Sequence, residues 1–297
     1  MSRHVLRRIL FLRAMGLRYL LFKVQSLFAR PHVHFERHLN AFRGSGLEVG
    51  GPSAVFRADG LFPVYESAQR VDNVTFANKT RWEGDVMDGQ NFIFHSKKEA
   101  GTQFVLEGGG LSSLPEASYD FILSSHMLEH TANPLRAMHE WRRLLKVEGK
   151  LLLILPHRDG SFDHRRPITT LAHLVDDFEQ DRGEDDTTHL REILDLHDLR
   201  RDPEQASMAD FEKWIRANET NRGAHHHVFD INLSVQMLTQ AGFQVSDVQA
   251  SMPFHICLLA AKLPANQEVN NERFLRSGEQ AYRSSPFPTD RLHRTQA

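Results

Sequence analysis

The stretch GLEVGGPSAVF, residues 46–56, decides the fold of this chain. An apolar residue, an acid and another apolar residue lead into two glycines, which is typical of a buried strand that ends in a tight turn. Pro52 and Ser53 follow where a third glycine is expected, so the dinucleotide pattern G-x-G-x-x-G is absent. The stretch predicts a ligand-binding turn with an altered exit.

The composition is that of an ordinary globular protein. The 297 residues suffice for one large α/β domain or two small ones, with 40% hydrophobic residues and a formal net charge of −2. This balance gives no reason to expect a nucleic acid as partner. Cys257 is the single cysteine, which excludes an intramolecular disulfide and any multi-cysteine metal site. A reducing, cytoplasmic location is therefore predicted.

The N-terminal segment is basic, since residues 1–35 contain no Asp or Glu and several arginines. None of its apolar runs approaches the ~20 residues that a membrane span needs. We expect a basic helical segment over residues 1–43. It has two interpretations: peripheral contact of residues 1–30 with the inner face of a membrane, or a helix docked on the domain with its charges in solvent.

Short apolar runs alternate with helical patterns between residues 46 and 156. Strands are predicted at 47–50, 70–76, 103–107, 119–124 and 150–155. The segment NPLRAMHEWRRLLKVEG, residues 133–149, predicts a helix capped by Asn133 with Pro134 at its first position. The nearly continuous apolar run KLLLILP after it is typical of a strand buried on both faces. The pattern predicts an α/β fold, a doubly wound and mostly parallel sheet.

The chain becomes polar after Pro156. Residues 157–229 are rich in His, Asp and Arg, with short helical patterns such as SMADFEKWI, in which Ser207 is the predicted cap. Helix and strand patterns resume from 231 to about 263. We therefore predict one domain over residues 44–263, with 157–229 as a helical cap insertion before the final strand pair. The polar residues 264–297 are predicted to be a disordered tail.

Four landmarks together resemble a known family. The glycine turn is followed by LPEASYDFILSSHMLEH (114–130), LLKVEGKLLLILP (144–156), and AGFQV with FHICLLAAK (241–245 and 254–262). In this order they resemble the class I S-adenosylmethionine (SAM)-dependent methyltransferases, of the bacterial type-11-like kind whose domains contain LP…S(F/Y)D…LEH. The resemblance covers residues 44–156 and 230–263. It implies an enzyme with SAM as cofactor and a seven-stranded sheet whose last strand is antiparallel.

Cofactor contacts are predicted at the ends of the strands. Gly50 and Gly51 allow close approach to the backbone, and the helix start after them is expected to present free N–H groups. The resemblance matches Glu48 to an acid that organises the amino-acid end of SAM, and Glu107 to the acid near the adenine amino group. Thr75 stands where an acid that binds the ribose is expected, and Asp72 replaces it only under another register. The predicted cofactor-binding residues are Glu48, Gly50, Gly51, Ser53, Thr75, Glu107 and Ser125.

The catalytic base is predicted among the histidines. His126 follows the fourth strand, at the sheet edge where open α/β folds bind ligands, and either lines the site near the transferred methyl or has a structural role. In the insertion, Asp163 and His164, with the run 225–227, offer a base and an orienting carboxylate. The predicted catalytic residues are His126, His164 and Asp163.

A metal is the alternative use of the insertion. Candidate ligands are Asp185, Asp186, His189, His197 and Asp198, but their spacing matches no strong metal signature, and no metal is predicted. Of the run 225–227, at most His225 and His227 are expected to face one ion.

The predicted function is O-methylation of a small polar or glycan-type acceptor by direct methyl transfer with a histidine as general base. The alternative is a catalytically altered domain that keeps the fold and serves as a binding or scaffold partner.

Overall fold

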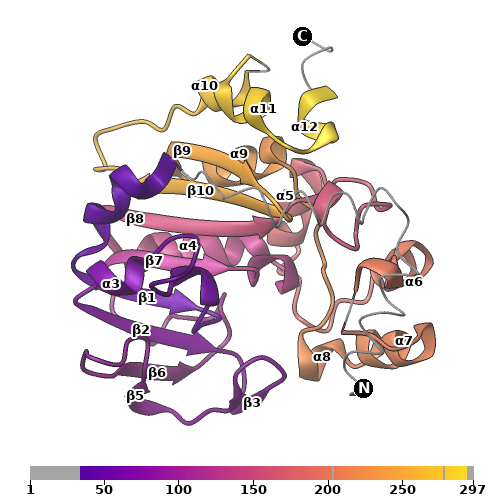
Figure 1. Cartoon of the computed structure of the whole chain (residues 1–297), viewed down its shortest axis with the longest axis horizontal. Coiled ribbons are helices and arrows are strands. Elements are labelled where there is room, and N and C mark those ends of the chain that lie inside the picture. The colour runs from indigo at the N-terminus through magenta and orange to yellow at the C-terminus, as the bar shows by residue number, and fades with distance from the viewer. Residues whose placement is uncertain (1–33, 203, 277, 293–297) are drawn as a thin grey trace.

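The computed structural model describes residues 34–202, 204–276 and 278–292, with side chains from residue 38. Within them, eight strands form one sheet with helices on both faces (Figure 1). The strand order is β5 (Gly89–Phe92), β6 (Gly101–Val105), β2 (Arg70–Thr75), β1 (Ser45–Val49), β7 (Tyr119–Ser125), β8 (Leu145–Pro156), β10 (His255–Lys262) and β9 (Phe243–Ser251).

Strands β6, β2, β1, β7 and β8 run parallel, while β10 is antiparallel to both of its neighbours. This confirms the doubly wound, mostly parallel sheet with an antiparallel last strand. The sequence did not predict β5, an antiparallel edge strand, or the ribbon of β3 (Lys79–Thr80) and β4 (Gly84–Asp85). These short strands carry little apolar alternation, which is the signal that a sequence pattern needs.

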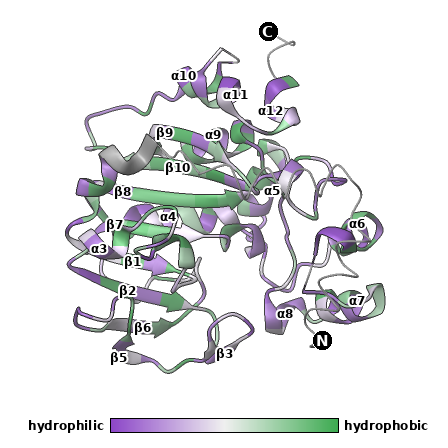
Figure 2. Cartoon of the chain, viewed as in Figure 1, coloured by the Kyte–Doolittle hydropathy of each residue, from purple (hydrophilic) through white to green (hydrophobic). Residues whose placement is uncertain are grey.

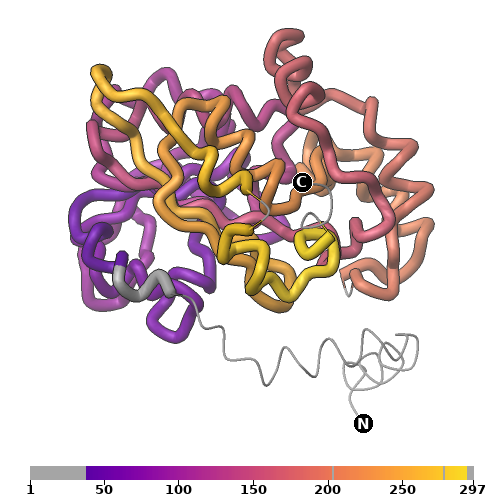
Figure 3. Tube along the Cα trace, turned by 90° about the horizontal axis from the view of Figure 1, so that it is seen from above, coloured from indigo at the N-terminus to yellow at the C-terminus, as the bar shows by residue number. Residues whose placement is uncertain are grey.

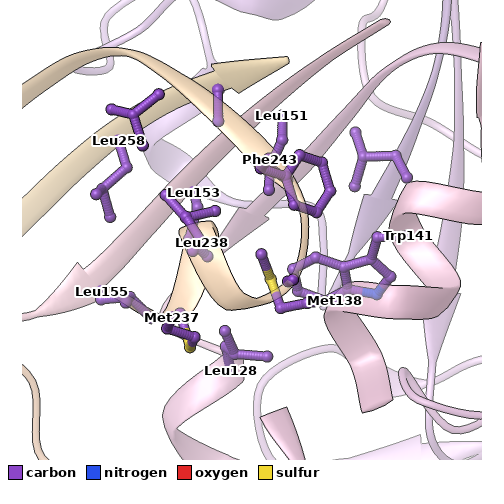
Figure 4. Packing of buried hydrophobic residues seen from close by; sticks show 14 of the residues in the cluster. Leu128, Met138, Trp141, Leu151, Leu153, Leu155, Met237, Leu238, Phe243 and Leu258 are labelled. Carbon is purple, nitrogen blue, oxygen red and sulfur yellow. The ribbon is translucent and has the colours of Figure 1, made fainter. Parts of the chain in front are cut away.

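The sheet has a separate hydrophobic core on each face, because successive side chains of a strand point to opposite sides. On β8, Leu151, Leu153 and Leu155 face one cluster, while Leu152 and Ile154 face the other. The first core lies under α4 (Pro134–Leu144) and α9 (Ile231–Gln240), whose side chains pack onto β8 (Figure 4). The second lies under η1 (His34–Phe42), η2 (Ala54–Phe56) and α3 (Val64–Ser67). Figure 2 shows the central strands as the most hydrophobic elements.

The predicted start of α4 is confirmed, but the helix predicted over residues 133–149 ends at Leu144, because β8 already begins at Leu145. The Asn133 side chain accepts a hydrogen bond from the Arg136 N–H, and Pro134 is the first residue of α4. At the other end of the domain, Gly242 follows α9 with φ +79°, a left-handed conformation that favours glycine. These local signals fix where the chain leaves a helix and enters a strand.

The cap insertion lies beyond the carboxyl ends of the parallel strands (Figure 1). It contains η4 (Arg158–Gly160), α5 (Leu171–Glu179), α6 (Leu190–Leu196), η5 (Leu199–Arg201), α7 (Met208–Arg216) and α8 (Asn218–Asn221). Ser207 caps α7 as predicted, by accepting from the Asp210 N–H. Helices α6 and α7 share a small core of Ile193, Phe211 and Ile215. The cap thus has some hydrophobic packing of its own.

The prediction of a disordered tail is wrong for the described part of residues 264–292, because this segment contains helices. These are α10 (Glu272–Leu275), α11 (Gln280–Ser284) and α12 (Pro288–Leu292). Phe274, Tyr282 and Phe287 are buried in the main core, and the Phe287 ring stacks on His157 at 4.0 Å. Seen from above, this segment runs toward the cap (Figure 3). Three aromatic residues anchor it although its average composition is polar.

The predicted basic helix and its membrane contact involve residues 1–33, which lie outside the described residues. Among the helices that the structure describes, none is long and apolar enough to cross a bilayer.

Candidate active site

A cavity of about 830 Å³ opens between the carboxyl ends of the parallel strands and the cap. Strands β1, β2, β6 and β7 supply one wall, and the segments around η4, α7 and residues 222–225 supply the other. Of the residues predicted to bind cofactor or act in catalysis, it is lined by Gly50, Gly51, Ser53, Thr75, Glu107, Ser125 and His126. The sheet topology thus brings together residues that lie far apart in the sequence.

The glycine turn is held by hydrogen bonds to the backbone and to one side chain of the next strand, β2. Gly50 has φ +85° and donates its N–H to the Val74 carbonyl at 2.9 Å. The Gly51 N–H donates to Asn73 Oδ1 at 2.9 Å, and Asn73 Nδ2 donates back to the Gly51 carbonyl at 3.0 Å. Pro52 lies at the rim, exposed, and leaves the cavity open. The altered exit therefore does not block the site.

Glu48 lies beneath the turn and does not line the cavity. Its carboxylate accepts hydrogen bonds from the Ser53 N–H at 2.9 Å and from the Tyr65 hydroxyl. Burial raises the pKa of Glu48, although these two hydrogen bonds oppose that shift. Since the Ser53 N–H is taken by Glu48, the expectation of a free N–H at this position is wrong. Glu48 supports the shape of the turn from below.

The strand register decides between Thr75 and Asp72. Thr75 ends β2 and lines the cavity. The Asp72 carboxylate instead accepts from the Thr102 N–H at 2.7 Å and from the Tyr119 hydroxyl at 3.1 Å, away from the cavity. No carboxylate of β2 therefore reaches the position where the resembled family places its ribose-binding acid. Glu107 does face the cavity, where its carboxylate pairs with Arg222 of the cap.

His126 is held at the cavity wall by a second histidine. It has φ +51°, and its Nε2 lies 2.8 Å from Nδ1 of His255, whose pKa burial lowers to about 3. Its Nδ1 lies 3.6 Å from the buried Glu129 carboxylate. The ring is therefore fixed in orientation with about a quarter of the side chain exposed. A fixed, part-exposed imidazole suits a positioning role.

The cap contributes a buried Asp–His pair. His225 lines the cavity, and its Nδ1 lies 2.6 Å from Oδ2 of Asp163. The other oxygen of Asp163 accepts from the Arg166 guanidinium at 2.9 Å. Burial lowers the pKa of His225, but the Asp163 carboxylate outweighs it and the net shift is upward. Asp163 is thus placed to orient an imidazole that faces the cavity.

The position of His164 corrects the expectation that it is catalytic. Its Nε2 bonds to Asp198 at 3.0 Å, and the residue does not line the cavity. Asp163 and His164 are neighbours in the chain, but only the aspartate points toward the site.

Aromatic and cationic side chains from the β3–β4 turn and from α7 also line the cavity. The Trp82 ring lies 5.4 Å from the His130 ring and 6.5 Å from Trp214, and the Arg81 guanidinium lies over Trp214 at 4.8 Å. Trp82 is 49% exposed, so its face is available to a ligand. The sequence did not predict these site residues, because Trp82 lies in a turn without periodic signal and the pattern of α7 does not reveal which of its side chains face a cavity. Burial and the neighbouring His225 lower the pKa of His130 to about 4.

The residues weighed as metal ligands do not converge on one ion. His197 pairs with Asp202 at 3.2 Å, Asp198 binds His164 and Arg200, and Asp186 accepts from Thr188. His225 and His227 also separate, because they join different clusters of possible ligands: His225 lies with Glu129 and His130, and His227 lies with His173, Asp177 and His189. The two histidines of the run that could have faced one ion thus lie in separate clusters.

Comparisons with known proteins agree with this architecture. The family model described as "Methyltransferase domain" matches residues 90–153. Among solved structures, the chain is similar to a SAM-dependent methyltransferase of Mesorhizobium loti (13% identity, covering 78% of this chain and 99% of the other, TM-score 0.42). It is also similar to 1,6-didemethyltoxoflavin-N1-methyltransferase of Burkholderia thailandensis, solved with S-adenosylhomocysteine (12% identity, covering 89% of this chain and 92% of the other, TM-score 0.40). A third similar structure is a SAM-dependent methyltransferase of Aquifex aeolicus (14% identity, covering 77% of this chain and 90% of the other, TM-score 0.35). At these identities and scores the structural likeness adds nothing to the family-model match. No curated protein matches the chain.

The strand order and the cavity at the strand ends are those of a Rossmann-like α/β fold. The methyltransferase-domain match over residues 90–153 supports the resemblance to the SAM-dependent methyltransferases of class I. The site fits the cofactor, since 830 Å³ lies within the range of roughly 300–1,000 Å³ for ligand pockets. Gly50 and Gly51 line the cavity with backbone alone, so a ligand can approach the main chain of the turn closely.

Proposed function

We propose that this enzyme transfers the methyl group of SAM to a hydroxyl of a small polar or glycan-type acceptor, with His225 as the general base. The observation that carries the proposal is the Asp163–His225 pair, in which a buried carboxylate holds an imidazole at the cavity wall. A hydroxyl that attacks an electrophile must lose its proton, and histidine is suited to accept it near neutral pH. This deepens the prediction of a histidine base and assigns it to a different histidine.

The bound cofactor would supply an electrophilic methyl group on a sulfonium, and the chain supplies position and proton transfer. The glycine turn with Thr75 and Glu107 would hold the cofactor on the sheet side. The proposed base lies on the cap side, so the acceptor would lie between the two walls. The cap would position the acceptor against the methyl group, and alignment of the reacting atoms is the main contribution that the chain can make.

The acceptor class is supported by aromatic and cationic residues that line the cavity. Trp82 and Trp214 line it with Arg81, whose guanidinium lies over the Trp214 ring, and Arg57 adds positive charge next to the glycine turn. Aromatic faces bordered by cationic and hydrogen-bonding groups suit a hydroxylated or anionic ring better than a long apolar chain. We assign His126 a positioning role, because its ring nitrogens lie near His255 and Glu129.

The test begins with labelled SAM incubated with the full chain and fractionated cell extract, followed by identification of the labelled product. An O-methyl product supports the proposal, and an N-methyl or C-methyl product overturns it. His225→Gln is then expected to reduce kcat about 10²–10³-fold while S-adenosylhomocysteine affinity stays within about twofold. His164→Ala is the matched control, one position from Asp163 but outside the cavity, and kcat should stay within about twofold. Equal effects of the two variants would remove His225 as the base.

A further inference from the structure

A second cluster of ligand-type side chains lies outside the cavity. His173 and Asp177 stand one turn apart on α5, His189 immediately precedes α6, and His227 lies in the segment that leads to α9. One ligand atom from each of these four residues lies within 4.8 Å of the others. None of the four lines the cavity. This cluster is therefore independent of the methyl-transfer site.

The spacing within the cluster is that of a coordination shell. Four ligands at about 2.0–2.1 Å from a tetrahedral centre lie roughly 3.3–3.4 Å from one another. His173 Nε2 lies 3.0 Å from His189 Nε2 and 3.4 Å from Asp177 Oδ2, and His227 Nε2 lies 3.6 Å from the same carboxylate oxygen. These separations differ from the tetrahedral edge by only a few tenths of an ångström. Small side-chain adjustments suffice to admit an ion at the centre.

A buried carboxylate oxygen without a hydrogen-bond partner indicates that the cluster binds a cation. Asp177 is 3% exposed, and its Oδ2 has no hydrogen-bond partner in the described part of the chain. His227 is also buried, and among the described residues its Nδ1 has no partner either. A buried polar group without a partner costs about 1–3 kcal/mol, more when it is charged. A cation bound by the Asp177 oxygen removes that cost.

We propose that His173, Asp177, His189 and His227 bind one divalent first-row transition-metal ion of the zinc type. Three imidazoles and one carboxylate suit such an ion, whereas Mg²⁺ and Ca²⁺ prefer sites made of oxygen ligands. Four protein ligands close the coordination shell, which is the form of a structural rather than a catalytic zinc site.

The ion would fasten the cap to the sheet domain. In Figure 1, α5 lies between the sheet and the cap helices α6–α8. The Asp177 carbonyl already accepts from Asn133, the cap of α4. His227 Nε2 lies 3.2 Å from the Ala132 carbonyl, so ion binding through this nitrogen would replace that hydrogen bond by a metal bond. Its neighbour His226 donates its backbone N–H to the Glu129 carbonyl. Metal binding at His227 would thus stabilise the loop that presents His225 to the cavity.

The test measures metal directly on the full chain. After chelator treatment and desalting, the protein is titrated with Zn²⁺ in competition with a chromophoric chelator, and bound metal is counted by elemental analysis. One Zn²⁺ per chain is expected, with affinity reduced more than about a hundredfold in His189→Ala and in Asp177→Asn, because even a residue behind a ligand costs about 10–100-fold. His139→Ala is the matched control, an exposed histidine on α4 that stacks on Phe178 of α5. It should bind Zn²⁺ like the unaltered chain.

The neighbouring group of Glu129, His130 and His225 is the competing site. Loss of the ion in His130→Ala with retention in His189→Ala would overturn the proposal and place the metal in the cavity wall. Absence of Zn²⁺ binding by the folded, unaltered chain would also overturn it. If the variants unfold, the unaltered chain decides: chelator treatment should lower Tm, and Zn²⁺ but not Mg²⁺ should restore it. None of these readouts depends on methyl transfer.

Discussion

Gly51→Ala tests whether Glu48 shapes the cofactor turn from below. A Cβ at position 51 would lie 2.1 Å from the Glu48 carboxyl carbon and 2.3 Å from Oε2. Since ordinary contacts are about 3.5–4.0 Å, the carboxylate must move by about 1.5 Å. That movement breaks its hydrogen bonds from the Ser53 N–H and the Tyr65 hydroxyl. Each buried group that loses its partner costs about 1–3 kcal/mol, so the expected loss of stability is about 3 kcal/mol.

Two assays measure the consequence. Thermal unfolding should show a Tm about 6–12 °C lower, from roughly 2–4 °C per kcal/mol for a chain of this size. Calorimetric titration with S-adenosylhomocysteine at a temperature where the variant is folded should show a Kd at least about tenfold higher, because the turn is displaced. Gly110→Ala is the matched control, since its Cβ would meet its nearest neighbour at an ordinary 3.6 Å.

A double variant identifies the cause. In a Glu48→Ala background the clash is absent, so Gly51→Ala should cost less than about 1 kcal/mol more. An equal cost in both backgrounds would refute the steric argument. Unchanged S-adenosylhomocysteine affinity in a destabilised Gly51→Ala protein would instead refute the assignment of this turn to the cofactor.

Other predictions use the same structure. A general base must be neutral, so kcat should fall as the pH drops through the raised pKa of His225. Asp163→Asn should shift this acidic fall in kcat to lower pH and should lower the maximal kcat. An unshifted pH profile would contradict the Asp163–His225 pair. Burial lowers the pKa of His255 to about 3, so below about pH 6.5 this histidine is protonated in the unfolded state but not in the folded state. Tm should therefore fall between pH 6.5 and 4. A Tm that does not change over this range would argue against the burial of His255. Trp82→Ala, at an exposed side chain, should raise the acceptor KM about tenfold and lower unfolding free energy by less than about 1 kcal/mol; an unchanged KM would remove it from the acceptor site. Phe287→Ala should lower unfolding free energy by about 3–5 kcal/mol in chemical denaturation, and a loss below about 1 kcal/mol would show that the segment before α12 does not pack as described.

The sheet could be predicted from the sequence because its signals are local. Strands buried on both faces appear as continuous apolar runs, such as 151–155, and Asn133 and Gly242 mark where neighbouring helices begin and end. Once the strand order is known, residues that follow parallel strands must meet at one edge of the sheet. Six of the seven predicted cofactor residues line the cavity for this reason.

The base could not be predicted in the same way. Asp163 and His225 are 62 residues apart, both in irregular segments, so neither periodicity nor spacing connects them. Composition was misleading at the C-terminus, where Phe274, Tyr282 and Phe287 bury themselves within an otherwise polar segment. Glu48 lies in β1, where its carboxylate accepts from the Tyr65 hydroxyl beneath the turn, and the position of Tyr65 is given only by the folded structure.

The short element η2 explains why a proline is tolerated after the glycine turn. In dinucleotide-binding folds the third glycine permits close packing between a helix and the first strand. Here the chain enters only the three-residue η2, and the exposed Pro52 meets no such requirement. Glycine is needed at position 50, where φ is +85°, and at position 51, where a Cβ would displace Glu48. The turn thus keeps glycine at the two positions where its own geometry demands it, and the missing third glycine is no evidence against a cofactor site.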